Sequence, residues 1–552
     1  MKRCQKLTLF LVLLAGCLST QAQNEPFTVR VVNPGYKLNS AWEVTYGPDD
    51  SLWVTESQAY KVSKLDPVTG NIRTLLDLNS NKNFTNPPKW PQGGLMGLVL
   101  HPTMYSEWNA PSKPYVYLAY VYQYNASTGC ANGSEPCNFK TKIVRYTYNR
   151  TNHSLSNETV ITQDLNGSND HNSGRLAIGL VSGQPYLFYT IGDMGAGQFN
   201  NSSRTNNAQN TNVPEGKVLR FNLEPDGDAV ESDKWIPNDN PFVSGGKATA
   251  VWTLGHRNAQ GIVFGSNGYL YSSEQQDKSD DEVNIIEKGR NYGWPKVSGY
   301  CDGNYTNQTL AGQNVGNEIT NCQTLNVKEP IYTLFTDPNP GNIGGSNMFW
   351  PTVACSSIDI YEKNAIPNWK ASLLVPGLKS GTIIRLKLSA DGKSIMDSST
   401  VPVMRNVGRF RDLAIAPDGI RIYAACDMNG SYLLANGTSS SGAGIYAGRI
   451  LEFTYTGTVM AINDSVNSYT RNTEVQIFPN PATSVLQVQS IKNMSKPLHW
   501  FLYDAAGKLV LNGKSNSDFF NIKVGSLTKG IYILKIKNGY NINIHTEKVI
   551  GQ

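Results

Sequence analysis

The stretch Leu413-Ala414-Ile415-Ala416-Pro417-Asp418-Gly419-Ile420-Arg421-Ile422-Tyr423 contains the unit from which the fold of this chain can be predicted. An apolar run leads into Pro, Asp and Gly, and a run rich in β-branched and aromatic residues follows. Because Pro and Gly supply the backbone angles of a tight turn, the stretch predicts a β-hairpin.

The same pattern recurs along the chain. It is visible around Gly47-Pro48-Asp49-Asp50 and around Gly265-Ser266-Asn267-Gly268, and in looser form in residues 98–120, 176–193 and 372–388. Repeats of short hairpin sheets separated by long loops predict an all-β fold in the form of a six-bladed β-propeller, which protects its strand edges by closing radially. One or two β-sandwiches are the alternative architecture.

Length and composition agree with several domains rich in β-structure. The chain has 552 residues, more than one average domain holds. Charged residues make up 16%, whereas Gly (50) and aromatic residues (10%) are plentiful, which argues against a coiled coil. The net charge is only +5 and no dense Lys/Arg run occurs, so nucleic acid is not an expected partner.

The first 23 residues have the order of a secretory signal peptide. Lys2 and Arg3 precede the apolar run 7–14, and small or polar residues follow. Cleavage near Ala22 is one alternative, and the lipoprotein-like box ending at Cys17 is another. Either route takes the protein out of the cytoplasm.

The cysteines downstream of this segment are even in number, which in an exported protein favours disulfides over metal thiolates. The predicted pairs are Cys130 with Cys137, Cys301 with Cys322, and, by elimination, Cys355 with Cys426. Neither a CxxC motif nor a histidine cluster is present, so a zinc or copper site is not expected.

The composition changes after the propeller region. Residues 24–456 form the predicted propeller, residues 457–473 a polar linker, and residues 474–552 a small β-sandwich with alternating strands at 485–488 and 530–535. The run Ile477-Phe478-Pro479-Asn480-Pro481-Ala482 resembles the start of the C-terminal sorting domain of the type IX secretion system. This resemblance implies that the type IX machinery is a partner and that the protein is secreted or held at the cell surface.

Two places hold candidate catalytic side chains. His171 follows Asp170 and stands 22 residues before Asp193, so a carboxylate could orient it as a general base near neutral pH. The alternative is a buried structural histidine. Arg257, in Gly255-His256-Arg257-Asn258, could stabilise developing negative charge, or could form a structural ion pair instead.

Two further places hold candidate ligand-binding groups. The acidic turn at residues 274–282 offers carboxylates and carbonyls suited to Ca²⁺, unless it is an ordinary solvated loop. The cations Lys379, Arg409 and Arg411 come from separate repeats. If they meet in one pocket they need a polyanionic ligand, and if they lie apart they indicate no site.

Residues 36–456 resemble the soluble quinoprotein glucose dehydrogenases, also grouped as glucose/sorbosone dehydrogenases. The shared motifs, in the same order, are Gly94-Leu95-Met96-Gly97, Asp170-His171-Asn172-Ser173-Gly174-Arg175-Leu176, Thr190-Ile191-Gly192-Asp193, Gly255-His256-Arg257-Asn258, Asn291-Tyr292-Gly293-Trp294-Pro295, Trp350-Pro351-Thr352-Val353 and Arg409-Phe410-Arg411-Asp412. The resemblance implies a six-bladed propeller that carries pyrroloquinoline quinone (PQQ) and calcium.

The resemblance also assigns roles to residues. It implies that His171 is the base, that Asp193 orients it, and that Arg257 acts on the quinone oxygen together with Ca²⁺. The implied contacts to quinone and sugar are Gln92, Asp170, Gln198, Arg257, Asn258, Trp350, Thr352, Lys379, Arg409 and Arg411. PQQ is a tricarboxylate, which accounts for the basic set. Trp350 could equally be a core residue.

Metal sites are implied in two segments. The cofactor's calcium would be held at Gln276 and Asp277, where the family has Gly-Pro. A second, structural calcium would be held by the backbone of Ser298 and Tyr300 with the Asp302 carboxylate, and Glu318 is the candidate for the last ligand. This chain also has Asn347 where the family has Tyr near the sugar, which weakens inference about substrate size.

The resulting hypothesis is a PQQ- and calcium-dependent oxidation of glucose-like aldose sugars at the anomeric carbon to the lactone, with hydride passing to PQQ and His171 as general base. An external electron acceptor would then reoxidise the cofactor. The alternatives are a calcium-dependent propeller lactonase or other hydrolase, and a non-catalytic glycan-binding propeller. The sugar, the acceptor and the oligomeric state, a homodimer included, stay open at this point.

Overall fold

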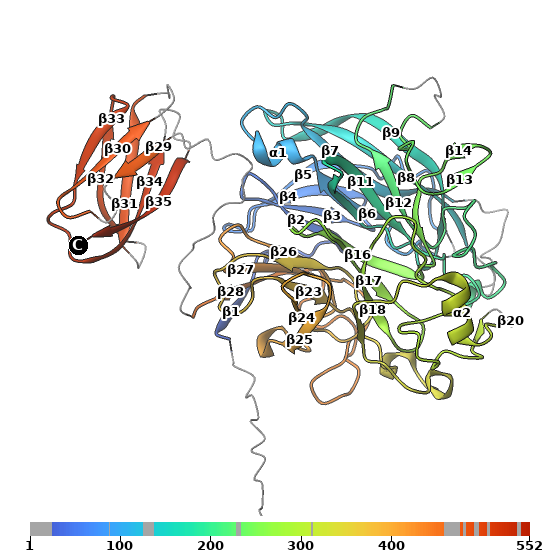
Figure 1. The fold of residues 1–552 in the computed structure, drawn as a ribbon. Helices are drawn as coiled ribbons and strands as arrows, with labels where there is room; N and C mark the ends of the chain where they lie inside the picture. The colour runs from blue at the N-terminus through green and yellow to red at the C-terminus, as the bar shows by residue number, and fades with distance from the viewer. Residues whose placement is uncertain are drawn as a thin grey trace, which may run out of the picture. The chain divides into compact units, whose positions relative to one another are not determined.

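The computed structural model describes residues 25–87, 89–124, 137–227, 233–310, 313–457, 475–478, 482–490, 496–504, 508–537 and 543–551. The chain divides between residues 463 and 464 into two compact units, each with its own hydrophobic core (Figure 1). The predicted signal peptide and all but the first residue of the predicted linker lie outside the described residues.

The first unit contains, within the described residues, six four-stranded antiparallel sheets. In five of them the strands follow one another in chain order. The first sheet contains β2 (Ala41–Tyr46), β3 (Leu52–Glu56), β4 (Lys61–Leu65) and β5 (Ile72–Asp77), and the second contains β6 (Leu95–Leu100), β7 (Tyr115–Tyr124), β8 (Asn138–Asn149) and β9 (Ser154–Ser168). The third contains β10 (Leu176–Val181), β11 (Gln184–Ile191), β12 (Lys217–Asn222) and β15 (Val251–Leu254), the fourth contains β16 (Asn258–Phe264), β17 (Leu270–Gln275), β18 (Asp281–Ile285) and β21 (Tyr332–Leu334), and the fifth contains β22 (Asp359–Tyr361), β23 (Ser372–Pro376), β24 (Ile383–Leu388) and β25 (Ile395–Thr400).

The sixth sheet joins the two ends of the unit. It contains β26 (Phe410–Ile415), β27 (Arg421–Cys426), β28 (Ile450–Tyr455) and, as its outer strand, β1 (Phe27–Val31). In this pairing Phe27 lies opposite Tyr455 and Val31 opposite Leu451. A strand from the start of the chain thus completes the sheet formed by the end of the unit.

Hydrophobic clusters connect the sheets into a closed ring. Each sheet shares one buried cluster with the next, and the sixth shares a cluster with the first through residues such as Ala425 and Val54. The predicted hairpins are confirmed as β2–β3, β16–β17 and β26–β27, and the looser ones as β6–β7, β10–β11 and β23–β24. In the hairpin quoted first, Gly419 has φ 72°, the left-handed angle that its turn requires.

A buried ion network lies at the centre of the ring. Arg175 donates to the carbonyl oxygens of Trp42, Gln260 and Ser356 at 3.0–3.2 Å. Its guanidinium also pairs with Glu43 at 2.7 Å and with Asp412 at 3.1 Å. One side chain therefore links the innermost segments of five of the six described sheets.

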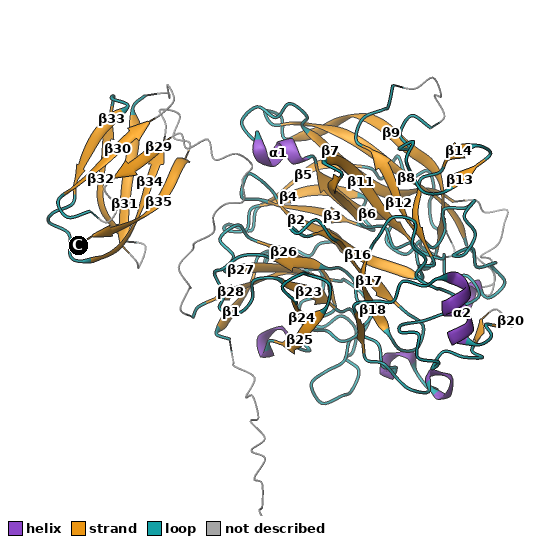
Figure 2. Cartoon of the chain, in the orientation of Figure 1, coloured by secondary structure: helices purple, strands orange, loops and turns teal. Residues whose placement is uncertain are grey.

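Helices are short and few in the part of the chain that the structure describes (Figure 2). They are α1 (Pro102–Ser106) and α2 (Glu318–Leu325), with the 3-10 turns η2 (Phe199–Asn201), η3 (Pro340–Asn342), η4 (Asn347–Phe349) and η5 (Pro402–Met404). Small two-stranded ribbons are formed by β13 (Val243–Ser244) with β14 (Lys247–Ala248), and by β19 (Thr309–Leu310) with β20 (Gln313–Asn314). Among the described residues, no helix has the length and apolar character needed to cross a membrane.

The cysteines follow the predicted pairing only in part. The disulfide Cys301–Cys322 is confirmed. Cys137 is disulfide-bonded, and its predicted partner Cys130 lies outside the described residues. The predicted Cys355–Cys426 pair is wrong: both are free, buried thiols that belong to different hydrophobic clusters. Each fills the core as a small apolar side chain, and burial raises the pKa of both thiols.

The second unit consists of two antiparallel sheets in its described residues. One contains β29 (Val475–Phe478), β30 (Val485–Ser490) and β33 (Phe519–Lys523), and the other β32 (Leu509–Ser515), β31 (Leu498–Asp504), β34 (Gly530–Lys537) and β35 (Asn543–Gly551). Leu486 and Val488 of the first sheet share a buried cluster with Leu502 and Leu534 of the second.

Candidate functional site

A cavity of about 580 Å³ opens where loops of several sheets meet. Half of its lining residues come from segments that lead into the first strand of a sheet, namely β10, β16, β22 and β26. The predicted site residues that line the cavity are Asp170, His171, Arg257, Gln276, Asp277, Trp350, Thr352, Lys379 and Arg409. Side chains that are far apart in the sequence therefore share one space.

His171 and Asp193 form a buried pair at the wall of the cavity. His171 Nδ1 lies 2.8 Å from Asp193 Oδ1, while Nε2 lies 3.7 Å from Asp170 Oδ1. The Asp193 side chain is fully buried, whereas that of His171 is 7% exposed. The second ring nitrogen is thus the one available on the cavity side.

The surroundings of Asp193 determine the form of this pair. Besides His171, its carboxylate accepts hydrogen bonds from Gly195 N at 2.9 Å and from the Gln198, Asn206 and Trp294 side chains at 3.3, 3.0 and 2.7 Å. Donors approach both oxygens, an arrangement that suits an ionised carboxylate. Such a carboxylate accepts from His171 Nδ1–H, the tautomer that leaves the Nε2 lone pair free.

The local backbone explains why the motif contains glycine. A Cβ on Gly192 would lie 2.0 Å from the carbonyl oxygen of His171, so only glycine lets the two loops approach this closely. His171 itself has φ 50°, an unusual angle for a side-chain-bearing residue. Such strain is held by surrounding contacts and is common at functional sites.

Asp170 lies beside the imidazole and is held by Gln92. Gln92 Nε2 donates to Asp170 Oδ1 at 3.2 Å, and Gln92 Oε1 accepts from Asn172 N at 3.0 Å. Gln92 is therefore behind the cavity wall, where it orients a lining residue. Asn258 is also behind the wall: it is fully buried and donates to Gln275 Oε1 at 3.0 Å.

Arg257 lies on the same side of the cavity as the acidic turn. Its guanidinium donates to Gln198 Oε1 and, at 3.1 Å, to the carbonyl of Gln275, and it lies 3.9 Å from Asp277 Oδ1. Gln198 also donates to Asp193, so one amide connects the arginine to the histidine pair. Arg257 lines the cavity, where it can meet a ligand, and it also faces the Asp277 carboxylate, so both predicted roles stay predictions.

Lys379 projects into the cavity from the loop after β23. Its ammonium donates to the carbonyls of Trp350 at 2.7 Å and Asn347 at 3.2 Å, and to the hydroxyl of Thr352. Burial lowers the pKa of Lys379 to about 8, although the charge of Asp281 opposes the shift. A buried cation with neutral partners is costly, and an anionic ligand would offset this cost.

Arg409 and Arg411 share the Asp427 carboxylate. Arg411 donates to Asp427 Oδ2 at 2.6 Å and to Gln260 Oε1 at 2.8 Å, and Arg409 Nε lies 3.5 Å from the same Oδ2. Arg409 lines the cavity, and its Nε faces Asp427 as an ion pair without the geometry of a hydrogen bond. Arg411 lies one layer behind, over the Trp42 ring, and is not among the described lining residues.

The acidic turn is buried, so the alternative of a solvated loop is wrong. Asp281 and Glu282 are 0% and 1% exposed. Asp281 accepts from Gln276 N at 2.9 Å and from Val353 N and Ala354 N at 2.8 Å, and thereby joins two walls of the cavity. Burial raises the pKa of Asp281. Across the described residues no group of three His, Cys, Asp or Glu side chains is placed to hold a metal.

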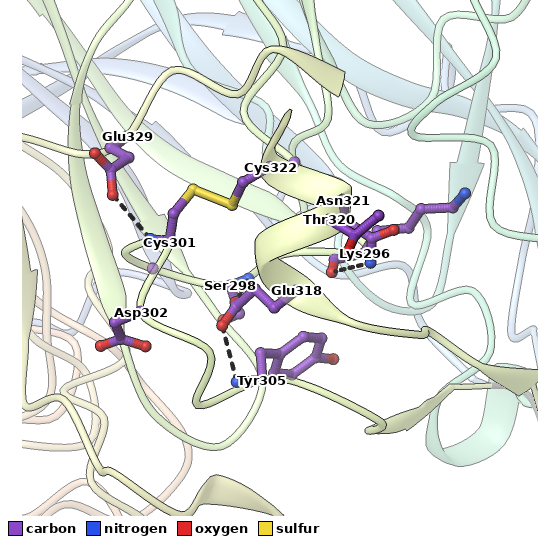
Figure 3. Close-up of a disulfide and its surroundings, with 12 residues drawn as sticks. Lys296, Ser298, Cys301, Asp302, Tyr305, Glu318, Thr320, Asn321, Cys322 and Glu329 are labelled. Carbon is purple, nitrogen blue, oxygen red and sulfur yellow. Dashed lines mark hydrogen bonds between the residues drawn. A yellow bond between two sulfur atoms is a disulfide. The ribbon is translucent and has the colours of Figure 1, made fainter. Parts of the chain in front are cut away.

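The segment of the second implied metal site lies beside the disulfide (Figure 3). Glu318, at the start of α2, accepts from Ser298 N at 3.4 Å and from Tyr305 N at 3.1 Å. Burial, together with the nearby charge of Asp302, raises the pKa of Glu318 to about 7. Ser298 and Asp302 are outside the cavity lining, although Ser298 Oγ donates to Gln276 Oε1 at 3.4 Å.

Aromatic rings line the mouth of the cavity. Trp350 is only partly buried and stacks on Phe199 with ring centroids 6.4 Å apart and an interplanar angle of 24°. The alternative of Trp350 as a core residue is therefore wrong. Phe199 is 57% exposed and also lines the cavity. Flat apolar faces of this kind suit the C–H face of a sugar ring.

Several site residues were not predicted as such. Trp294 and Asn206 donate to Asp193, Asp281 fixes the acidic turn, and Phe199 faces Trp350. Trp294 was visible within the motif 291–295, but a sequence does not say which carboxylate an indole will reach. Phe199 directly follows the predicted Gln198, and this adjacency is the available signal.

Known proteins resemble this chain over most of its length. Residues 38–435 match the glucose / sorbosone dehydrogenase family, and residues 476–552 match the secretion system C-terminal sorting domain. The quinoprotein glucose dehydrogenase B of Acinetobacter calcoaceticus is 34% identical over 79% of this chain and 92% of its own length. The aldose sugar dehydrogenase YliI of Escherichia coli is 26% identical over 76% of this chain and 95% of its own.

Solved structures support the fold. The PQQ-bound aldose sugar dehydrogenase of Streptomyces coelicolor has a TM-score of 0.50 at 22% identity and covers 78% of this chain and 98% of its own. The apo form of the soluble aldose sugar dehydrogenase of Escherichia coli has a TM-score of 0.53 at 20% identity, with 78% and 100% covered. With a family match over most of its length, the chain is an oxidoreductase that belongs to the glucose/sorbosone dehydrogenase family.

Proposed function

We propose that this protein is an exported, PQQ- and calcium-dependent aldose dehydrogenase that oxidises glucose-like sugars at the anomeric carbon to the lactone. One observation carries the proposal: a histidine with its free nitrogen on the cavity side shares a single cavity with Lys379 and Arg409. Family membership supports sugar oxidation as the overall chemistry.

The cavity suits PQQ in size and charge. Its volume of about 580 Å³ is within the range of small-molecule sites. Lys379 is a buried cation, and Arg409 is a partly buried one that shares the single Asp427 carboxylate with Arg411. The two arginines thus have positive charge left to receive a carboxylate of the ligand. Arg411, behind them, would set the position of Arg409 through their common partner Asp427. When bound, PQQ would supply the electron-accepting quinone.

The side chains of the cavity would transfer the proton, stabilise developing charge and hold the sugar. His171 Nε2 would accept the proton of the anomeric hydroxyl, and the ionised Asp193 would stabilise the imidazolium that forms. Arg257 would stabilise negative charge that develops near Asp277 and Gln198. Trp350 and Phe199 would pack on the sugar, while Gln92, Asp170, Asn258 and Thr352 would keep these groups in position.

Calcium is proposed at two places. Asp277 and the main-chain oxygens of Gln276 offer hard ligands next to Arg257 in the cavity. Asp302, with the carbonyls of Ser298 and Tyr300 and the carboxylate of Glu318, offers the second set. Burial is the main cause of the raised pKa of Glu318, and the charge of Asp302 adds to it. A cation bound at this place would offset both effects.

We further propose the domain arrangement that this function requires. The six sheets would be the blades of one propeller over residues 24–456, and the two C-terminal sheets, which share one core, would form the sandwich over residues 474–552. Residues 1–23 would be a cleaved signal peptide and residues 457–473 a linker. The C-terminal sorting domain indicates type IX secretion, to the surface or the medium.

Reconstitution tests the proposal. The purified full chain would be loaded with PQQ and Ca²⁺, and reduction of a redox dye, standing in for the external acceptor, would be followed with a panel of aldoses. Dye reduction that depends on both PQQ and sugar is expected. Dye reduction without PQQ would contradict the proposal, and lactone hydrolysis or sugar binding without oxidation would favour the two alternative functions.

A further inference from the structure

The indole of Trp294 touches both halves of the proposed catalytic machinery. Its Nε1 donates to Asp193 Oδ2 at 2.7 Å, and the guanidinium of Arg257 lies 5.3 Å from its ring centroid. Trp294 is fully buried and packs with Ala208, Tyr305 and Leu310 in a small cluster. The indole therefore bridges the histidine pair and the arginine.

The position of this indole is itself fixed. Trp294 N donates to the carbonyl of Gly255 at 3.0 Å, and the carbonyl of Trp294 accepts from Gln209 Nε2 at 2.7 Å. Gln209 is held in turn by Asn291 Nδ2 at 2.7 Å. With both backbone groups bound and the ring packed, the indole has little freedom to turn away from Asp193.

We propose that Trp294 is a positioning residue for the base: its N–H keeps Asp193 an acceptor-only carboxylate and thereby holds His171 with Nδ1 protonated and Nε2 free. An indole N–H can only donate, so Asp193 cannot place a proton on the oxygen that faces it. Gln198 and Asn206 could rotate to present their carbonyl oxygens, but Trp294 has no such alternative. Among the described side-chain donors to Oδ2, the indole is the one that cannot turn to become an acceptor, and it therefore favours the ionised carboxylate.

This inference rests on the proposed function, in which His171 is the base. Its test does not, because the protonation of His171 can be followed without sugar or cofactor. The full chain would be labelled with ¹⁵N-histidine, and the imidazole signals of His171, identified by their absence in His171→Ala, would be titrated. The unsubstituted protein is expected to show the Nδ1–H tautomer above the titration midpoint.

Trp294→Phe keeps the aromatic packing but removes the donor. The Asp193 charge is then less neutralised, which favours the imidazolium, so the His171 midpoint should rise by about half a pH unit to one pH unit. In the reconstituted enzyme the acid limb of the kcat profile should move in the same direction. Asn206→Leu removes another donor from the same oxygen and should act in the same sense.

Leu310→Ala is the matched control, because it opens a cavity beside Trp294 without removing a donor. It should lower the unfolding temperature and leave the His171 midpoint in place. The other titratable or charged groups that face the pair or line its cavity are Asp170, Arg257, Asp277, Asp281, Tyr305, Lys379 and Arg409, and all are retained in these variants.

Two outcomes would overturn the proposal: an unshifted midpoint in Trp294→Phe, or an equal shift in Leu310→Ala. If Trp294→Phe does not fold, the ¹⁵N-indole signal of Trp294 in the unsubstituted protein decides instead. That signal should move with the His171 titration, and independence of the two would refute the coupling. Coupling in a protein that oxidises no sugar would leave this inference standing and remove the proposed function.

Discussion

His171 acquires its proposed role from its neighbours. A histidine in a sequence is most often structural, and His256 shows the difference: it too pairs with a carboxylate, Glu274 at 2.8 Å, but it is fully buried and donates or accepts only within the fold at its described contacts. His171 has the same kind of pair and a free nitrogen on a cavity. A ring nitrogen that a substrate can reach from the cavity, rather than the pairing with a carboxylate, distinguishes a general base from a core histidine.

His171→Ala should therefore reduce kcat by about 10²–10⁴-fold, the usual contribution of a general base. PQQ affinity should change little, since the cations that would bind it are intact. Stopped-flow dye reduction and a separate cofactor titration measure the two quantities. His153→Ala, at a site remote from the cavity lining, is the control. Near-normal turnover of His171→Ala would refute the assigned role.

Lys379 should make the affinity for PQQ depend on pH. Its pKa, lowered by burial to about 8, lies below the usual value of 10.5. A bound carboxylate raises that pKa again, so PQQ binding takes up a proton once the pH exceeds about 8 and its affinity falls as pH rises from there. Quenching of tryptophan fluorescence by PQQ at pH 7 and pH 9.5 measures this change.

The matched variant is Lys379→Met, which should bind PQQ weakly at pH 7 and lose most of the dependence on pH. Lys387→Met, on β24 outside the cavity lining, is the control and should retain both. An affinity of the unsubstituted protein that stays constant between the two pH values would exclude Lys379 as a carboxylate contact.

The sequence predicts which residues belong to the site better than it predicts whether each one lines the cavity or lies behind its wall. Lys379 and Arg409 line the cavity as expected, but Arg411 lies behind it. The position of Arg411 behind the wall depends on a β-bulge between Phe410 and Asp412 in β26. No local sequence pattern predicts this bulge. Trp294 and Asp193 are 101 residues apart, so their hydrogen bond could not be foreseen.

The sequence predicts a hairpin where the residues that cause it lie within the hairpin itself. The turn residues that define β2–β3, β16–β17 and β26–β27 act within four positions, so their hairpins follow from sequence. The loop that carries Phe199 and Asn206 is different. Its path depends on contacts such as Lys217 Nζ donating to the carbonyls of Asn207 and Ala208, each at 2.9 Å, and tertiary contacts of this kind leave no sequence pattern.

The loop closed by Cys301–Cys322 and helix α2 carries the second proposed calcium site. Adding Ca²⁺ to metal-free protein should raise the unfolding temperature of the first unit, by the equivalent of about 2.7 kcal/mol at a hundredfold excess over Kd. Glu318→Gln should lose most of this increment, because it removes a carboxylate that faces Ser298 and Tyr305. Calorimetry with Ca²⁺ and with chelator measures it.

Glu329→Gln is the matched control, since Glu329 accepts from Cys301 N, at the start of this loop, at 2.8 Å but is outside the proposed ligand set (Figure 3). It should keep the full calcium increment. Equal increments in Glu318→Gln, Glu329→Gln and the unsubstituted protein would show that calcium is bound elsewhere.

For the whole unit, the repeat of hairpins indicated a ring, but the closing strand was not among the predicted elements. β1 is short and three of its five residues are exposed, so it lacks a strong apolar alternation. Its partner β28 lies more than 400 residues away. The strand forms because the edge of β28 is available there, which is a property of the assembled ring and not of residues 27–31.

Closure can be weakened at one residue. Phe27 packs on Trp369 and Tyr455 with ring centroids 5.5 Å apart in each case, and thereby fixes β1 to the fifth and sixth sheets.

Phe27→Ala removes this aromatic packing from a partly exposed site, so it should lower the free energy of unfolding of the first unit by about 2–3 kcal/mol. Val29→Ala, at a 39% exposed position of the same strand, should cost less than about 1 kcal/mol. Urea unfolding of both variants measures the difference. Because a ring opened at one junction exposes both neighbouring sheets, Phe27→Ala should also speed proteolysis of the unit, and equal behaviour of the two variants would show that β1 does not close it.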